Sequence, residues 1–187
     1  MKTLTFCSKL IMLSLIVLFI ACNKGDIPLT LVAKPITSDK MRLDGYYYSN
    51  TPSDKGGEPL QSVFFFYRNG VMFFPFTTKV SDVPQSLQDL NLKVNKDAYQ
   101  KDATKDAWGI FTIEGENIEY QRLYDGGSCR RPMKYCKGTI LNDTTYLITE
   151  CTDFKIGNNK DKTFAVNNTY HFKRFFPKID SLNPWYK

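Results

Sequence analysis

The run Phe64–Phe74, with the sequence FFFYRNGVMFF, is the feature that most constrains the fold. Two aromatic and apolar segments flank the pair Asn69-Gly70. An Asn-Gly pair in this setting predicts a β-hairpin with a two-residue turn, in which both turn residues have positive φ. That register places Phe66 opposite Phe73. Such aromatic cross-strand pairs each stabilise a sheet by up to about 1 kcal/mol.

Short segments of strand character, separated by turn residues, continue along the rest of the chain. Successive strands joined by short turns favour an antiparallel up-and-down barrel over parallel units with helical crossovers. We therefore expect a mainly β protein folded as an eight-stranded antiparallel barrel. The predicted strands are residues 43–50, the two arms of the 64–74 hairpin, 108–114, 118–124, 133–141, 144–152 and 163–175.

One segment has the period of a helix. Apolar residues between the third and fourth strands are spaced by four or three positions, which predicts an amphipathic helix over residues 83–98. Ser81 or Asp82 is suited to the N-cap, and Pro84 falls in the first turn, where proline is tolerated. The apolar face of this helix needs cover, either as a lid over the barrel mouth or against the outer wall of the barrel. The apolar positions are Val83, Leu87, Leu90, Val94 and Ala98.

The first 21 residues are typical of an export signal. Lys2 and Lys9 are followed by the apolar stretch Leu10–Ile20, which only Ser14 interrupts, and by the small residue Ala21. A membrane-spanning helix needs roughly 20 apolar residues, so this stretch is too short to span a bilayer comfortably. The sequence predicts a signal peptide over residues 1–21.

Cys22 is the expected first residue of the mature protein. The tetrad Phe19–Cys22 resembles a bacterial lipobox, in which the cysteine sulfur carries a diacylglycerol, although Phe replaces the usual Leu at its first position. Two or more acyl chains anchor a protein stably. We therefore expect a lipid-anchored protein of the bacterial cell envelope, held at the outer membrane on its periplasmic or surface side. Residues 22–42 would be the lipidated cysteine and a tether, and residues 43–187 the barrel domain.

Charge and composition exclude several functions. The chain has 25 Lys and Arg against 19 Asp and Glu, and its basic residues are scattered, whereas a nucleic-acid-binding surface is clustered. His171 is the single histidine and no CxxC motif occurs, so we expect no metal site and no cofactor. His171 lies on a predicted strand between aromatic residues and no nucleophile–base arrangement is evident, so we do not expect an enzyme.

Cysteines 129, 136 and 151 remain after lipidation of Cys22. Disulfides persist outside the cytoplasm, but spacing alone leaves all three pairings open. In the predicted 133–152 hairpin, Cys136 shares a face with Gly138 and Ile140, and this face should meet that of Leu147, Thr149 and Cys151. This alternation favours a Cys136–Cys151 bridge.

Several segments together resemble the lipocalin-like lipoproteins of Bacteroidetes. The resemblance covers roughly residues 40–176 and implies a calycin-type barrel and an envelope location, with no specific activity. In place of the Gly-x-Trp of lipocalins the chain has Gly45-Tyr46-Tyr47, so the resemblance implies that Arg174, or Lys173, packs on Tyr47 to close the barrel. The segments are LDGYYYSN, FFFYRNGVMFF, WGIFTIEGENIEYQ, GTILNDTTYLIT and YHFKR.

Two functions agree with these features. An eight-stranded barrel is wide enough to be filled by side chains or to hold one small ligand. The first function is binding of a small apolar or aromatic molecule, or of a glycan. The second is a lipid-tethered interaction module with a filled barrel and a protein partner in the envelope. The candidate lining residues for a ligand, chosen by strand alternation, are Phe64, Phe66, Phe73, Trp108, Ile110, Tyr120 and Tyr146.

Overall fold

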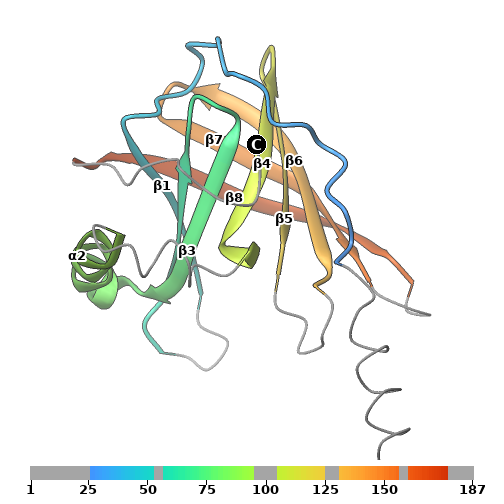
Figure 1. The fold of residues 1–187 in the computed structure, drawn as a ribbon. Coiled ribbons are helices and arrows are strands. Elements are labelled where there is room, and N and C mark those ends of the chain that lie inside the picture. The colour runs from blue at the N-terminus through green and yellow to red at the C-terminus, as the bar shows by residue number, and fades with distance from the viewer. Residues whose placement is uncertain (1–25, 53–56, 95–104, 125–130, 156–159, 177–187) are drawn as a thin grey trace, which may run out of the picture.

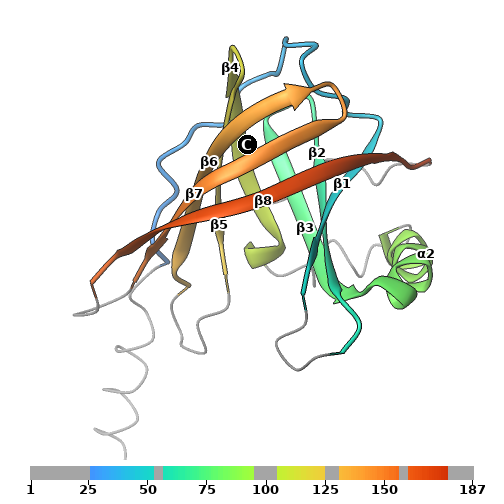
Figure 2. The same ribbon diagram turned by 180° about the vertical axis from the view of Figure 1, so that it is seen from behind.

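The computed structural model describes residues 26–52, 57–94, 105–124, 131–155 and 160–176. Eight strands form a closed barrel in chain order, with every neighbouring pair antiparallel and β8 paired with β1 (Figures 1 and 2). The predicted fold class is confirmed. The strands are β1 (Gly45–Thr51), β2 (Leu60–Phe66), β3 (Val71–Lys79), β4 (Trp108–Glu114), β5 (Asn117–Leu123), β6 (Met133–Asn142), β7 (Thr145–Phe154) and β8 (Lys162–Arg174).

The barrel has two different ends. The β2–β3, β4–β5 and β6–β7 turns lie at one end, at the top of Figure 1, which we call the closed end. A segment that precedes β1 crosses this end, where the Ile36 amide donates to the Arg68 carbonyl and the Arg42 amide to the Asp143 carbonyl, at 2.7 and 2.9 Å. We call the opposite end, where β6 begins and β7 ends, the mouth.

Residues 26–44, which we call the strap, follow the barrel from the mouth to the closed end. At the mouth, the Ile27 amide of the strap donates to the Arg131 carbonyl. At the closed end, Ile36 and Met41 of the strap are buried against the interior core (Figure 1). Residues 22–42 were expected to form a tether, but residues 26–42 are held against the barrel. These residues pack on the barrel because their apolar side chains plug its closed end. Cys22 lies outside the described residues.

The aromatic hairpin has a different turn from the predicted one. Gly70 has a φ of 80°, and no non-glycine residue among those described has positive φ. The Tyr67 amide donates to the Val71 carbonyl and the Gly70 amide to the Tyr67 carbonyl, each at 3.0 Å, as in a type I turn followed by a glycine bulge. Phe73 therefore pairs with Phe65 rather than Phe66. The predicted register was wrong by one residue, which reverses the face of every side chain on β3.

A second irregularity in β3 follows Phe74. Phe74 shares the inward face of Met72 by simple alternation, and its ring packs on Phe64 inside the barrel, with ring centroids 4.7 Å apart. The β2–β3 register shifts between Val63 and Phe65, so that β3 has one residue more than β2 at Phe74-Pro75. Proline has no N–H to donate to a ladder and is tolerated at such a bulge, beyond which Phe76 packs against the wall cluster.

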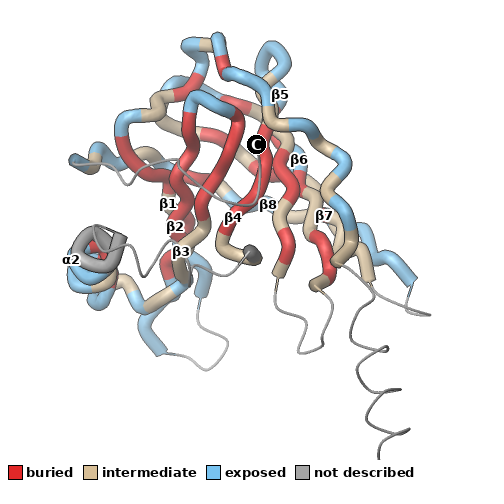
Figure 3. The backbone as a smooth tube through the Cα atoms, viewed as in Figure 1, coloured by how far each residue is buried: buried red, intermediate tan, exposed pale blue. Residues whose placement is uncertain are grey.

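Two apolar clusters form the core, and Figure 3 shows the buried backbone concentrated in the upper and middle barrel. The interior cluster fills the barrel, with Tyr47, Phe66, Phe111 and Tyr146 among its most buried members. The wall cluster lies outside the barrel, on the outward faces of β1 to β4. Its members are Tyr46, Val63, Phe65, Tyr67, Val71, Phe73, Val83, Leu87 and Trp108.

The predicted helix is confirmed as α2 (Val83–Val94), between β3 and β4, and a 3-10 turn η1 (Val80–Asp82) precedes it. Val83 and Leu87 belong to the wall cluster, so the described part of α2 covers the outer wall and not the mouth (Figure 1). Residues 95–98 of the expected helix lie outside the described residues. A second 3-10 turn, η2 (Lys105–Ala107), leads into β4. Within the described ranges, no helix is long and apolar enough to span a bilayer.

Candidate functional site

The closed half of the barrel is filled by aromatic side chains. Phe66 and Phe111 meet edge to face with centroids 4.8 Å apart, and the Tyr47 and Tyr146 rings lie 5.2 Å apart. The Tyr146 ring stacks on that of Tyr170 at 4.7 Å, which forms a floor across the middle of the barrel. Each of these rings is buried, so a ligand has no room in this half.

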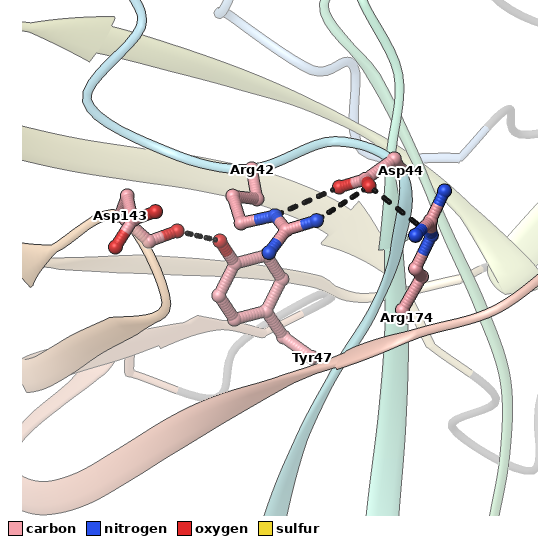
Figure 4. Close-up of polar contacts among 5 residues, drawn as sticks. All are labelled: Arg42, Asp44, Tyr47, Asp143 and Arg174. Carbon is pink, nitrogen blue, oxygen red and sulfur yellow. Dashed lines mark hydrogen bonds and ion pairs between the residues drawn. The ribbon is translucent and has the colours of Figure 1, made fainter.

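Polar contacts hold the closed end together (Figure 4). The Tyr47 hydroxyl donates to the Asp143 carbonyl at 2.8 Å. Asp44 accepts from the Arg42 Nε and Nη2 at 3.0 and 2.6 Å, and its Oδ2 lies 3.8 Å from the Arg174 Nε. The hydrogen bond with Arg42 lowers the pKa of Asp44 below its ordinary value.

The Tyr47–Arg174 pair that the resemblance implied is not formed as expected. Arg174 pairs with Gly45 in the sheet, and Phe172 is the residue opposite Tyr47. The Tyr47 ring accordingly packs on the Phe172 ring at 5.4 Å. The cation over that phenylalanine comes from the strap, since the Arg42 guanidinium lies 4.6 Å from the Phe172 centroid. An arginine does close this end, but it precedes the first strand.

The seven candidate lining residues separate into two groups. Phe64, Phe66, Tyr120 and Tyr146 belong to the interior cluster. Phe73 and Trp108 belong to the wall cluster, with ring centroids 4.4 Å apart, and Ile110 pairs with Val71 on the same outward face. The expectation that these three line the interior is wrong. For Phe73 the cause is the extra turn residue at Gly70, which moves the odd-numbered positions of β3 outward. Trp108 and Ile110 lie outward because the β4–β5 pairing places Phe111, and not Ile110, opposite the inward-facing Tyr120.

The mouth half of the barrel is less completely filled. Phe74, Phe164 and Val166 face inward against the interior cluster and are only partly buried. Asn168 follows them on the inward face of β8 and is exposed, although the next inward residue, Tyr170, is buried. Inward-facing side chains at this end are therefore in contact with solvent. On β8, Phe164 and Val166 keep the alternation of Tyr170 and Phe172, so this pattern in the sequence predicts their inward position.

Arg122 is the cation of the mouth half. It follows Tyr120 on the inward face of β5, opposite Lys134 on β6. Its guanidinium carbon lies 4.3 Å from the centroid of the Phe74 ring. Its Nη1 donates a long bond of 3.4 Å to the Leu123 carbonyl, while its Nε is buried without a hydrogen-bond partner. Alternation along the strand from Ile118 through Tyr120 predicts that Arg122 also faces inward.

Tyr170 of the aromatic floor and Tyr120 of β5 are the tyrosines nearest to Arg122. Burial raises the pKa of Tyr120 and of Tyr170 above the ordinary phenol value, so both hydroxyls remain protonated at neutral pH. Burial likewise lowers the pKa of Arg122. An arginine nevertheless stays charged, because its ordinary pKa is above about 12. The site thus presents one guanidinium and two phenols beneath partly exposed aromatic rings.

Ion pairs surround this site. Arg131 contacts Asp26 of the strap and Asp106 of η2, at 3.6 and 3.7 Å. The Lys134 Nζ lies 3.3 Å from Asp153 on β7. The Lys155 Nζ donates to the Tyr124 hydroxyl at 3.0 Å. The rim is consequently close to electrically balanced.

A disulfide joins Cys136 of β6 to Cys151 of β7 on the inward face, which is the pair that strand alternation favoured. The regular alternation of inward and outward side chains is interrupted nearby in this hairpin. A register shift places Ile148 opposite Gly138 and Tyr146 opposite Ile140, so Leu147 and Thr149 do not share the face of Cys151 as expected. Cys129 lies outside the described residues.

Pockets also occur outside the interior. A pocket of about 660 Å³ lies between the strap and the β2–β3 turn, and one of about 370 Å³ lies between α2 and the end of β8. No group of three or more His, Cys, Asp or Glu residues that could hold a metal ion is found in the described ranges.

These features define a closed eight-stranded antiparallel barrel, with buried aromatic side chains in its closed half and partly buried ones in its mouth half. No family model, curated protein or solved structure matches the chain.

Proposed function

We propose that this protein is a lipid-anchored binding protein of the cell envelope that holds a small apolar or aromatic molecule in the mouth half of its barrel. The observation that carries this proposal is the set of partly exposed apolar side chains on the inward face of the mouth. Phe74 comes from β3 and Phe164 and Val166 from β8, on different sides of the barrel. A folded protein normally buries inward-facing apolar groups, so their exposure favours a site that a ligand completes.

The character of the surroundings favours an apolar ligand. Phe64 packs edge to face on Tyr170 at 5.3 Å, and Phe74 packs on Phe64 at 4.7 Å, so aromatic faces and edges continue from the floor toward the mouth. Burying apolar surface contributes about 25 cal/mol per Å², so covering even 200 Å² would contribute about 5 kcal/mol before the cost of association. This is enough for selective binding of a small molecule.

The anchor rests on the sequence. The signal-like residues 1–21, the lipobox-like tetrad ending at Cys22 and the likeness to lipocalin-like lipoproteins all support acylation of Cys22. The protein would then act at a membrane while its barrel stays in water.

Binding is tested with N-phenyl-1-naphthylamine, an uncharged dye that fluoresces in apolar surroundings. Val166→Trp places an indole inside the mouth, while Ala165→Trp places one on the outward, exposed face of the same strand. We expect the wild-type protein and Ala165→Trp to bind the dye alike and Val166→Trp to bind it at least tenfold more weakly, with both variants folded by circular dichroism. No dye binding by the wild-type protein would contradict the proposal.

The alternative function is an interaction module that binds another envelope protein. The pocket between α2 and the end of β8 supports it, because Phe175 lines this pocket and Phe176 beside it is 89% exposed. A wild-type protein that binds no dye, and whose Phe176→Ser variant loses capture of an envelope protein, would favour this second function.

A further inference from the structure

We infer that the ligand carries a single acidic group, a carboxylate or a comparable monoanion, which Arg122 binds inside the barrel while the apolar part of the ligand lies against Phe74 and Phe164. This inference rests on the proposed function, because it names the chemistry of a ligand in the same mouth half.

The bonding of Arg122 is the first support. An arginine has five N–H donors, yet the described contacts of Arg122 are one long bond to the Leu123 carbonyl and the face of Phe74. The Nε is buried with no acceptor, and Arg122 forms no ion pair with any described carboxylate. A buried donor without an acceptor is costly, and a carboxylate that accepts two parallel N–H bonds removes that cost.

The charges around Arg122 are the second support. Asp106 and Asp153, the carboxylates whose charges act on Arg122, lie within ion-pair distance of Arg131 and Lys134 respectively. Arg131 also contacts Asp26, so these two basic residues have three carboxylate partners in the structure, whereas Arg122 forms no ion pair with a described carboxylate. One unpaired cation matches one negative charge on the ligand. The two nearby carboxylates, Asp106 and Asp153, would repel a second negative charge on the ligand, which disfavours a phosphate dianion.

The neighbouring phenols are the third support. Tyr120 and Tyr170 are hydrogen-bonded to each other, with the Tyr120 hydroxyl donating to that of Tyr170, so the Tyr170 hydroxyl keeps its own proton to donate to an oxyanion beside Arg122. The Phe74 ring beneath the guanidinium fixes the plane of Arg122. The half-buried ring of Phe164 on the inward face of β8 offers an apolar surface for the rest of the molecule beside Lys134, whose Nζ lies 5.6 Å from the ring centroid.

The test compares two ligands that differ only in charge. Dodecanoate and dodecanol compete with N-phenyl-1-naphthylamine for the wild-type protein, for Arg122→Met and for the matched control Arg131→Met, whose arginine is already ion-paired at the rim. A hydrogen bond to a charged group contributes about 1.5 to 3 kcal/mol, so we expect dodecanoate to compete roughly 10- to 100-fold better than dodecanol. This preference should be absent in Arg122→Met and retained in Arg131→Met.

Each result decides between the two proposals. Dye binding with equal competition by the two ligands would overturn the acidic-head inference and leave the proposed function standing. A wild-type protein that binds no dye would overturn the proposed function itself. An equal loss of preference in Arg122→Met and Arg131→Met would also overturn the inference, because the rim charge alone would then attract the anion.

A spectroscopic measurement avoids the variants altogether. Dodecanoate labelled with 13C at its carboxyl carbon is titrated while bound to the wild-type protein. We expect the carboxyl resonance to titrate at lower pH than that of free dodecanoate, because an adjacent cation favours the ionised form. A carboxyl resonance that titrates at higher pH would place the head in apolar surroundings away from Arg122 and overturn the inference.

Discussion

The Tyr47 hydroxyl donates a 2.8 Å hydrogen bond to the carbonyl oxygen of Asp143, which ties the first strand to the β6–β7 turn across the closed end of the barrel. The neighbouring Tyr146, whose ring lies 5.2 Å from that of Tyr47, has a buried hydroxyl with no hydrogen-bond partner. Of these two adjacent buried phenols, one therefore has its hydroxyl hydrogen-bonded and the other does not. Removing the two hydroxyls should change the free energy of unfolding in different directions.

We expect Tyr47→Phe to lower the free energy of unfolding by about 1 kcal/mol, since it removes a made hydrogen bond and leaves the Asp143 carbonyl without this donor. Tyr146→Phe should leave it unchanged or raise it by up to about 1 kcal/mol, because it removes an unsatisfied buried group. Urea unfolding followed by tryptophan fluorescence measures both. Equal losses in the two variants would contradict this assignment.

The two glycines with positive φ give a second matched pair. A Cβ at Gly70 would lie 2.5 Å from the Lys34 carbonyl oxygen in the strap, whereas a Cβ at Gly115, at a φ of 62°, meets nothing within 4 Å. Gly115→Ala should therefore lose only the backbone term, about 1 to 2 kcal/mol. Gly70→Ala should lose clearly more and should raise proteolysis of the strap at Lys34. Similar melting temperatures for the two variants would show that the strap does not pack against the turn.

The disulfide should contribute to stability. It joins cysteines separated by 15 residues, and a closed loop of this size corresponds to roughly 3 kcal/mol in the chain-entropy account. The double variant Cys136→Ala/Cys151→Ala should unfold at lower urea concentration than the oxidised wild-type protein. Reductant should destabilise the wild-type protein and leave the double variant unaffected. An identical response of the two proteins to reductant would argue that the bridge is not formed.

The position of α2 can be tested by separating stability from binding. Leu87 is buried in the wall cluster and Gln88 is exposed beside it. Leu87→Ala should cost about 2 to 5 kcal/mol, and Gln88→Ala should cost little. Neither should change the affinity for N-phenyl-1-naphthylamine, because the described part of the helix covers the outer wall. A changed dye affinity in a folded Leu87→Ala variant would indicate instead that the helix acts as a lid.

Acylation is tested in cells of a bacterium that processes lipoproteins. We expect the full-length protein to sediment with membranes after a high-salt wash. Cys22→Ser should move it to the soluble fraction, since the variant lacks the thiol that we propose as the lipid acceptor. Cys7→Ser, within the predicted signal, is the control and should leave the protein with the membranes.

The arrangement of strands could be predicted from the sequence because turn residues mark strand ends. Gly115 marks the turn between β4 and β5, and the Asn142-Asp143 pair marks the turn between β6 and β7. The faces of the strands were harder, since they depend on counting single residues. One additional turn residue in the β2–β3 hairpin sufficed to move Phe73 from the expected interior to the outer wall, and a β4–β5 register one residue from the expected one did the same for Trp108.

The candidate site could be predicted only in part. Tyr120 was found because it alternates regularly along β5, and the same alternation extends to Arg122. Phe74 was missed because the predicted turn at Asn69-Gly70 was one residue too short, which assigned the even-numbered positions of β3 to the outer face. The strap was missed for another reason. Ile36 and Met41 are isolated apolar residues among polar ones, and no period marks them as part of a core.

The strap also fixes which way the barrel faces. Its first described contacts, from Asp26 and Ile27 to Arg131, are at the rim of the mouth. Three residues lie between Cys22 and Asp26, and a fully extended chain spans at most about 14 Å from one to the other. Once acylated at Cys22, the protein would therefore be held with its opening turned toward the bilayer surface. An amphiphile could then pass between the lipid leaflet and the barrel over a short path, without being released into bulk water.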